Sequence, residues 1–298
     1  MDYLVPFITA FIFSFAAILV FKPIAAKVGL LDVPNERKCH DGAIPLIGGI
    51  AIFFSVLLAS GLFIKSSQTL NLYLISSSLI LAVIGSINAF NMVDGIDGLA
   101  GMLSLVTFTS LSVLFYRAGN DWFLLPLLFD AAILAYLFFN LRWPFDSVQK
   151  IFMGDAGSML IGLTVVWLLV LGTQSYNVHQ GAVLNEVVFS PVTALYLIAI
   201  PLMDMVAIMY RRIRKGFSPF KADRDHLHHI FERAGYNRKQ TLVRITLLSL
   251  LLALCGLAGE FYQVPESIMF SLFIILFISY NWALAHVWQI ITWLKRND

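Results

Sequence analysis

Long apolar stretches recur along the chain, and they limit what it can fold into more than any other feature. The first, "YLVPFITAFIFSFAAILVF", has no charged residue, and further stretches of 18 or more residues follow. Each is long enough to cross about 30 Å of hydrocarbon as a helix. Because 59% of the 298 residues are hydrophobic and only 13% are charged, a soluble domain could not cover itself with polar side chains. The sequence therefore predicts an all-α, polytopic transmembrane helical bundle.

We expect about nine transmembrane spans in a single integral membrane domain over residues 1–298. The spans are predicted at residues 3–21, 46–64, 70–90, 102–116, 122–141, 158–173, 189–209, 241–260 and 267–289. Lys and Arg orient such a bundle, because cytoplasmic loops carry an excess of them. Seventeen of the 20 lie in one set of alternate loops or in the C-terminal tail. This asymmetry predicts that the N-terminus faces outward and that this set of loops is cytoplasmic.

Four polar islands interrupt the apolar stretches, and the predicted topology places all four on the cytoplasmic face. They are "GLLDVPNERKCHDGAIPLIGG" (29–49), "NAFNMVDGIDGLAG" (88–101), "KIFMGDAGSMLIG" (150–162) and "RRIRKGFSPFKADRDHLHH" (211–229). Polar residues gathered at one face predict one composite site. A transporter, the less favoured alternative, would place its polar residues near the bilayer midplane, between pseudo-symmetric halves.

Three acidic residues in two of these islands indicate a divalent metal site. Asp94 and Asp97 stand among glycines three residues apart, and residues with this spacing are neighbours on a helix. Asp155 lies between Gly154 and Gly157, just before a predicted span. Carboxylates at a membrane edge suit Mg²⁺ or Mn²⁺, which prefer oxygen ligands and keep several waters for substrate phosphates. The structural alternatives are a solvated turn at Asp94 and Asp97 and a helix cap at Asp155.

Three histidines in "DRDHLHH" indicate a site for phosphate. His226, His228 and His229 follow Arg224, and histidines that donate hydrogen bonds beside Arg suit phosphate oxygens. A zinc site fits less well, because neither an H-E-x-x-H spacing nor a cysteine partner accompanies them. Asp204, within the predicted span 189–209, is assigned no role beyond polar packing, although among the polar residues inside the spans it is the one most expected to border the composite site. Together the islands predict metal-assisted phosphoryl transfer at the inner membrane surface.

Four segments together resemble the motifs of the polyprenyl-phosphate N-acetylhexosamine-1-phosphate transferases, over nearly the whole chain. They are "NAFNMVDGIDGL", "FMGDAGS", "SPVTALYLIAIPLMDMVAIMYRR" and "DHLHH". The resemblance implies a multi-pass enzyme of the bacterial inner membrane, with its active site facing the cytoplasm. It implies that UDP-N-acetylglucosamine and undecaprenyl phosphate give undecaprenyl-diphospho-N-acetylglucosamine and UMP, with Mg²⁺ or Mn²⁺. This reaction would be the first membrane step of O-antigen or enterobacterial common antigen synthesis, and no nucleic-acid partner is expected.

The same resemblance assigns roles to individual residues. Asp155 would hold the metal, and Asp94 and Asp97 would line the nucleotide-sugar site, with the carboxylate of Asp94 a second candidate metal ligand. The candidate catalytic residues are therefore Asp94, Asp97 and Asp155. The candidate substrate-binding residues are Asp32, Asn91, Arg224, His226, His228 and His229.

The chain departs from this family in one respect. The family carries an adjacent Asp-Asp pair on an inner loop before the "NAFNMVDG" segment, and no two Asp residues are adjacent in this chain. A non-catalytic relative that binds nucleotide sugar or lipid phosphate without turnover is therefore the alternative to an enzyme.

Overall fold

The structure of the protein is a computed structural model. It describes residues 4–28, 31, 32, 44, 45, 47, 51, 54, 55, 58, 59, 62, 63, 67–142, 149–174, 176–179, 182–185, 187–219 and 226–286. Two compact units are distinguished, Met1–Leu81 with Ile208–Asp223 and Ala82–Ala207 with Arg224–Asp298. The single domain expected over the whole chain stays a prediction.

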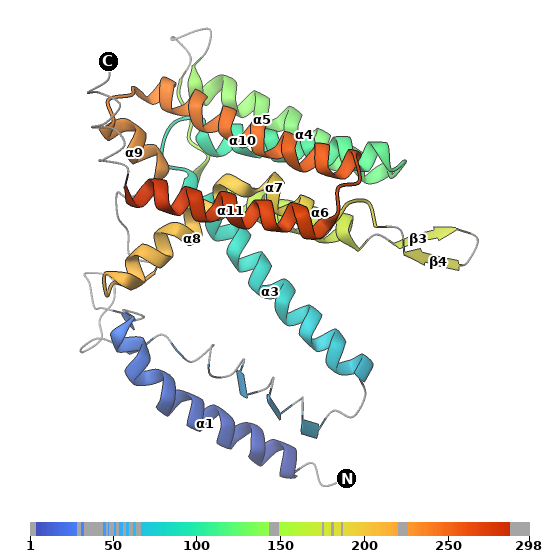
Figure 1. Cartoon of the computed structure of the whole chain (residues 1–298), viewed down its shortest axis with the longest axis vertical. Coiled ribbons are helices and arrows are strands. Elements are labelled where there is room, and N and C mark those ends of the chain that lie inside the picture. Colours follow the sequence, from blue (N-terminus) through green and yellow to red (C-terminus); the bar gives the residue numbers. More distant parts are fainter. Residues whose placement is uncertain are drawn as a thin grey trace. The chain divides into compact units, whose positions relative to one another are not determined.

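The first unit begins with helix α1 (Leu4–Lys27), which is long and apolar enough to cross a membrane (Figure 1). Two short strands, β1 (Leu31–Asp32) and β2 (Ile44–Pro45), pair antiparallel after it, with Asp32 opposite Ile44. The predicted span 46–64 lies largely outside the described residues.

The second unit is built mainly of helices. Helices α3 (Ser67–Val93) and α8 (Ala199–Arg214) each have residues in both units. The other elements are α4 (Leu99–Arg117), η1 (Asp121–Phe123), α5 (Leu124–Leu141), α6 (Gly154–Thr173), β3 (Tyr176–His179), β4 (Ala182–Asn185), α7 (Pro191–Leu197), α9 (Leu227–Arg233), α10 (Arg238–Phe261) and α11 (Glu266–Ala285). Helix α4 is central, since it packs against α5, α6, α7 and α10. Strands β3 and β4 form an antiparallel pair.

The predicted class, a polytopic helical membrane protein, is confirmed. Among the described residues, six helices are long and apolar enough to span a bilayer, and the bent pair of α7 and α8 would make a seventh. The predicted spans 102–116, 122–141, 158–173, 241–260 and 267–289 fall on α4, α5, α6, α10 and α11. Many large side chains on these helices are exposed and apolar, among them Leu128, Leu134, Ile275 and Ile278. Such a surface suits contact with lipid chains.

The predicted span 189–209 is not one straight helix, and Pro201 explains the difference. Helices α7 and α8 meet at an angle of 81° around Ile198. Pro201 has no N–H to donate to the carbonyl of Leu197, four residues earlier, and its ring crowds that carbonyl. The one hydrogen of the Thr107 hydroxyl on α4 is shared between the Leu197 carbonyl, at 3.0 Å, and the Leu103 carbonyl of its own helix, at 3.1 Å. Because a carbonyl in hydrocarbon needs a donor, α4 stabilises the bend.

Helices α3 and α6 approach each other closely at Gly162. A Cβ atom at this position would lie 2.7 Å from Ile87 Cα and 2.8 Å from the Ser86 carbonyl oxygen. Only glycine leaves room for such backbone contact. The hydroxyl of Ser86 donates to the Gly162 carbonyl at 2.8 Å. The contact fixes the last turns of α3 against the first turns of α6.

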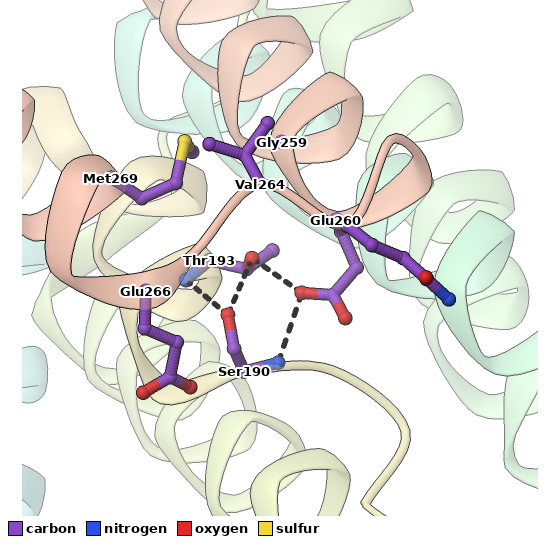
Figure 2. Close-up of a pocket in the computed structure, with 8 residues that line it drawn as sticks. Ser190, Thr193, Gly259, Glu260, Val264, Glu266 and Met269 are labelled. Atoms are coloured by element: carbon purple, nitrogen blue, oxygen red, sulfur yellow. Dashed lines mark hydrogen bonds between the residues drawn. The ribbon is translucent and has the colours of Figure 1, made fainter.

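The C-terminal end of α10 is bonded to the start of α7. Glu260 Oε2 accepts hydrogen bonds from the Ser190 N–H at 3.0 Å and from the Thr193 hydroxyl at 2.6 Å (Figure 2). Ser190 Oγ in turn accepts from the Thr193 N–H at 3.3 Å. A cavity of about 230 Å³ lies beside these residues. Since the first N–H groups of a helix lack partners within it, these bonds stabilise the junction of α7 with α10.

The bend between α7 and α8 can be tested by Thr107→Val. This change leaves the Leu197 carbonyl without its donor, and we expect the free energy of unfolding in detergent to fall by about 1–3 kcal/mol. The matched control is Thr164→Val, because the Thr164 hydroxyl donates to Leu160 in its own helix. Equal losses in the two variants, measured by denaturant titration, would contradict this account of the bend.

Candidate functional site

Asp94 and Asp97 lie on a tight loop between two helices, where the predicted spans 70–90 and 102–116 leave them, and they do not share a helix face. Helix α3 ends at Val93 and α4 begins at Leu99. Gly98 ends the loop with a φ of 75°, in the left-handed region that glycine adopts without strain. The loop therefore joins two apolar helices within five residues, and it carries both carboxylates.

Asn91, in the last turn of α3, reaches the start of α6. Its Nδ2 donates to Asp155 Oδ1 at 3.2 Å and to Ser158 Oγ at 3.0 Å. The alternative interpretation of Asp155 as a helix cap is wrong, because the N-cap of α6 is Met153 and no side chain makes a capping hydrogen bond there. The close approach at Gly162, two turns further along α6, explains why Asn91 and Asp155 meet.

A cavity of about 230 Å³ opens beside the loop. It is lined by Asp94, Gly95, Ile96, Asp97, Tyr136, Asn140, Lys150, Phe152, Met153 and Arg238. Lys150 Nζ donates to Asp97 Oδ2 at 2.7 Å. Asn140, near the end of α5, donates to the carbonyl of Ile151 at 2.7 Å, which fixes the segment that carries Lys150. Two cationic side chains and two carboxylates thus line one cavity.

Like charges are held close together at Asp94. Burial raises the pKa of the Asp94 carboxyl above its ordinary value, and the negative charges of Asp155 and Asp97 raise it further. A divalent cation would relieve this repulsion. Among the described residues, no group of three or more His, Cys, Asp or Glu is arranged to hold a metal ion by itself. The residues fit an ion such as Mg²⁺, which takes one or two carboxylates and completes its shell with water and phosphate oxygens.

His228 rests against this loop and is buried. A Cβ atom on Gly95 would collide with the His228 ring, so the missing side chain of Gly95 makes room for the imidazole. Burial, followed by the nearby His229 and His226, lowers the pKa of His228 from 6.5 to about 4. His228 is therefore neutral at pH 7. Both of its ring nitrogens are buried without a hydrogen-bond partner among the described residues.

Asp204 on α8 contacts the histidine cluster, a contact that the sequence did not predict. Its Oδ2 lies 3.1 Å from His226 Nδ1. Its Oδ1 accepts from the N–H of Leu227 at 3.2 Å and from the Tyr280 hydroxyl at 3.0 Å. The rings of His226 and His228 stack with their centroids 5.6 Å apart.

Glu232 links the histidine cluster to the rim of the cavity. Its Oε2 lies 3.3 Å from His229 Nδ1, and its Oε1 accepts from Arg238 Nε at 3.3 Å. Arg238 lines the cavity together with Asp94 and Asp97. The second and fourth polar islands therefore meet at one place in the second unit.

The structure brings together most, but not all, of the candidate residues. Asn91 and Asp155 are bonded, Asp94 and Asp97 line the cavity, and His226, His228 and His229 lie beside the loop. Arg224 lies outside the described residues, and only the backbone of Asp32 is described, in β1. The roles assigned to all of them stay predictions.

Sequence reasoning missed several residues of this site, namely Lys150, Ser158, Glu232, Arg238 and Tyr280. Lys150 and Ser158 stand in the island that holds Asp155, so a closer reading of that island could have included them. Tyr280 belongs to the predicted span 267–289, Arg238 stands just before the predicted span 241–260, and no spacing connects them to the other islands.

Known proteins place this chain in a family. Residues 15–173 match glycosyl transferase family 4. The chain is 41% identical to the undecaprenyl-phosphate alpha-N-acetylglucosaminyl 1-phosphate transferase of Haemophilus influenzae, over 96% of this chain and 95% of that protein. Proteins of the same name from Pasteurella multocida and Escherichia coli are 40% and 37% identical, over 98% and 97% of this chain and 96% and 93% of theirs. This chain belongs to glycosyl transferase family 4.

Membership of glycosyl transferase family 4 makes the chain an enzyme, and it does not favour the non-catalytic or transporter alternatives. The alignment with the Haemophilus influenzae relative runs over 346 positions, more than the 298 residues of this chain. That relative therefore has residues with no counterpart here.

The contact between Gly95 and His228 can be tested by Gly95→Ala. The added methyl group would displace the His228 ring from the loop, and we expect transfer activity to fall at least about tenfold. The control is Gly85→Ala on α3, where an added Cβ would meet nothing within 4 Å, and its activity should stay within about twofold of wild type. Equal activities of the two variants would mean that the contact has no part in the site.

Proposed function

We propose that this enzyme transfers N-acetylglucosamine 1-phosphate from UDP-N-acetylglucosamine to undecaprenyl phosphate, and releases UMP. The observation that carries the proposal is the arrangement around one cavity. Asp94, Asp97 and Lys150 line it, Asp155 is close enough to act on Asp94, and Gly95 in the same lining contacts a neutral histidine whose nitrogens have no described partner. Relatives at 37–41% identity bear the name of this activity.

The reaction exchanges one phosphoanhydride bond for another. An oxygen of the lipid phosphate attacks the β-phosphorus of the UDP-sugar, and the bond from that phosphorus to the oxygen of UMP breaks. The electron pair leaves with UMP, and the products are UMP and undecaprenyl-diphospho-N-acetylglucosamine. The attacking phosphate is already anionic near neutral pH, so no proton has to be removed first. The task of the protein is therefore to align the two phosphates and to offset their charges.

The residues of the site suit this task. Asp155 and Asp94 would hold Mg²⁺ or Mn²⁺, which offsets negative charge on the diphosphate oxygens when bound. Lys150, held by Asp97, places a positive charge at the cavity. Asn91 fixes the carboxylate of Asp155 through one hydrogen bond. His228, being neutral, offers one N–H to a phosphate oxygen without drawing a proton from it.

The lipid and the soluble substrate have to meet at a membrane surface. We place the enzyme in the bacterial inner membrane with the site on the cytoplasmic face, because seventeen of 20 Lys and Arg lie on that side of the predicted topology. UDP-sugars are soluble and undecaprenyl phosphate is a membrane lipid. The product would be the first membrane intermediate of O-antigen or enterobacterial common antigen synthesis.

The role of Asp155 can be tested by Asp155→Asn. The amide keeps the size of the side chain but removes the charge that a cation needs, so metal-dependent transfer should fall at least about tenfold, equivalent to about 1.4 kcal/mol. Calorimetry should show an equal loss in metal-dependent binding of UDP-N-acetylglucosamine. The matched control is Asp121→Asn in η1, outside the site. An unchanged metal dependence of Asp155→Asn would remove this residue from the proposed metal site.

The proposed sidedness can be tested at the two ends of α10. In a background without Cys39 and Cys255, Tyr262→Cys should react with an impermeant thiol reagent added to intact cells. Lys239→Cys, near the start of the same helix, should react only after the membrane is made permeable. Both positions are exposed, so access alone decides the labelling. The reverse pattern would place the site on the outer face and contradict the proposal.

A further inference from the structure

Asp204 is a buried acid that joins three elements of the second unit. Its exposed fraction is 2%. It lies on α8, and it accepts hydrogen bonds from the first residue of α9 and from Tyr280 on α11. His226 stands directly before α9, and its Nδ1 lies 3.1 Å from the other carboxylate oxygen of Asp204, Oδ2. A buried carboxylate is costly unless donors surround it, and two different helices supply them here.

The contacts of Asp204 constrain the imidazole of His226. A carboxylate can only accept hydrogen bonds, so His226 Nδ1 carries the proton when Asp204 is ionised. Nε2 is then the ring atom left for a substrate. The bond to the Leu227 N–H also fixes where α9 begins. Because His228 is in the first turn of α9, that bond fixes its position on Gly95 as well.

We propose that Asp204 is a positioning residue of this enzyme, which holds His226 with the proton on Nδ1 and presents Nε2 to the diphosphate of the substrate. The proposal rests on the proposed function, since it assumes that the histidine cluster meets the diphosphate. Tyr280 supports Asp204 in this role, because its hydroxyl donates to Oδ1, the carboxylate oxygen that does not face His226. The last described helix, α11, is thus a part of the site.

The deciding variant is Asp204→Asn. The amide oxygen still accepts from Leu227 and Tyr280, but the amide nitrogen donates to His226 Nδ1, and the ring proton has to move to Nε2. We expect kcat to fall at least about tenfold, while the KM for UDP-N-acetylglucosamine changes by less than about threefold. The melting temperature should stay near that of wild type. The control is Asp130→Asn, another buried acid in a span, bonded to Thr109, which should keep its activity.

A double-mutant cycle separates positioning from a purely structural role. If Asp204 acts through His226, Asp204→Asn should lower kcat by less than about twofold in a His226→Asn background. A full additional loss in that background, or an equal loss in Asp130→Asn, would overturn the proposal. Should Asp204→Asn fail to fold, Tyr280→Phe takes its place in the cycle. Its smaller loss, about two- to fivefold, should vanish in the same background, and persistence of that loss would overturn the proposal.

The ring proton itself can be observed without any turnover. In protein labelled with ¹⁵N-histidine, the signals that vanish in His226→Asn belong to His226. They should report a proton on Nδ1 in wild type and on Nε2 in Asp204→Asn. A proton that stays on the same nitrogen in both would overturn the proposal. A different outcome is that the proton moves as expected between wild type and Asp204→Asn while wild-type protein transfers no sugar phosphate. That outcome would contradict the proposed reaction alone.

Discussion

Burial of the Asp94 carboxylate beside two other acids, at the ends of apolar helices, is the constraint on which the rest of this site depends. Asp94 is half-buried, and Asp155 and Asp97 are close enough to raise the pKa of its carboxyl. Such a group lowers stability, because the folded state has to keep negative charges together. It is held in place by apolar packing that starts directly behind the loop. Leu99, Ala100 and Leu103 of α4 are fully buried in the core of the second unit.

The packing that holds these acids is made at a few backbone contacts. Gly162 lets α6 touch α3, and this contact keeps Asp155 within reach of Asn91. Thr107 satisfies the carbonyl that Pro201 leaves without a donor, and this contact directs the helix that carries Asp204. Each contact links residues far apart in the chain, and each would be lost if the helices slid by one turn. The geometry of the site is therefore set by helix packing, and only locally by the loops.

The parts of this site that could be predicted from the sequence are those with a local signal. Hydrophobic stretches define the spans, and acids or histidines among glycines stand out against them, so Asp94, Asp155 and His228 could be found. The predicted spans leave Asp94 and Asp97 between two helices, but the tight conformation of that loop could not be predicted, because glycines at that spacing fit a helix or a turn. Pro201 was visible, but the direction of its bend depends on Thr107 on another helix. Tyr280 could not be found either, since 76 residues separate it from Asp204.

The balance of charge around the cavity explains how a site without an adjacent Asp-Asp pair could still work. Asp94, Asp97 and Asp155 are acids, Lys150 is paired with Asp97, and Glu232 is paired with Arg238. His228 adds no charge at pH 7, since burial lowers its pKa to about 4. With the acids ionised, the cavity region keeps two uncompensated negative charges, and one divalent cation would offset them. A diphosphate brought to the same cavity alone would meet like charge at close range. The cation and the nucleotide sugar should therefore bind together, and each should raise the affinity of the site for the other.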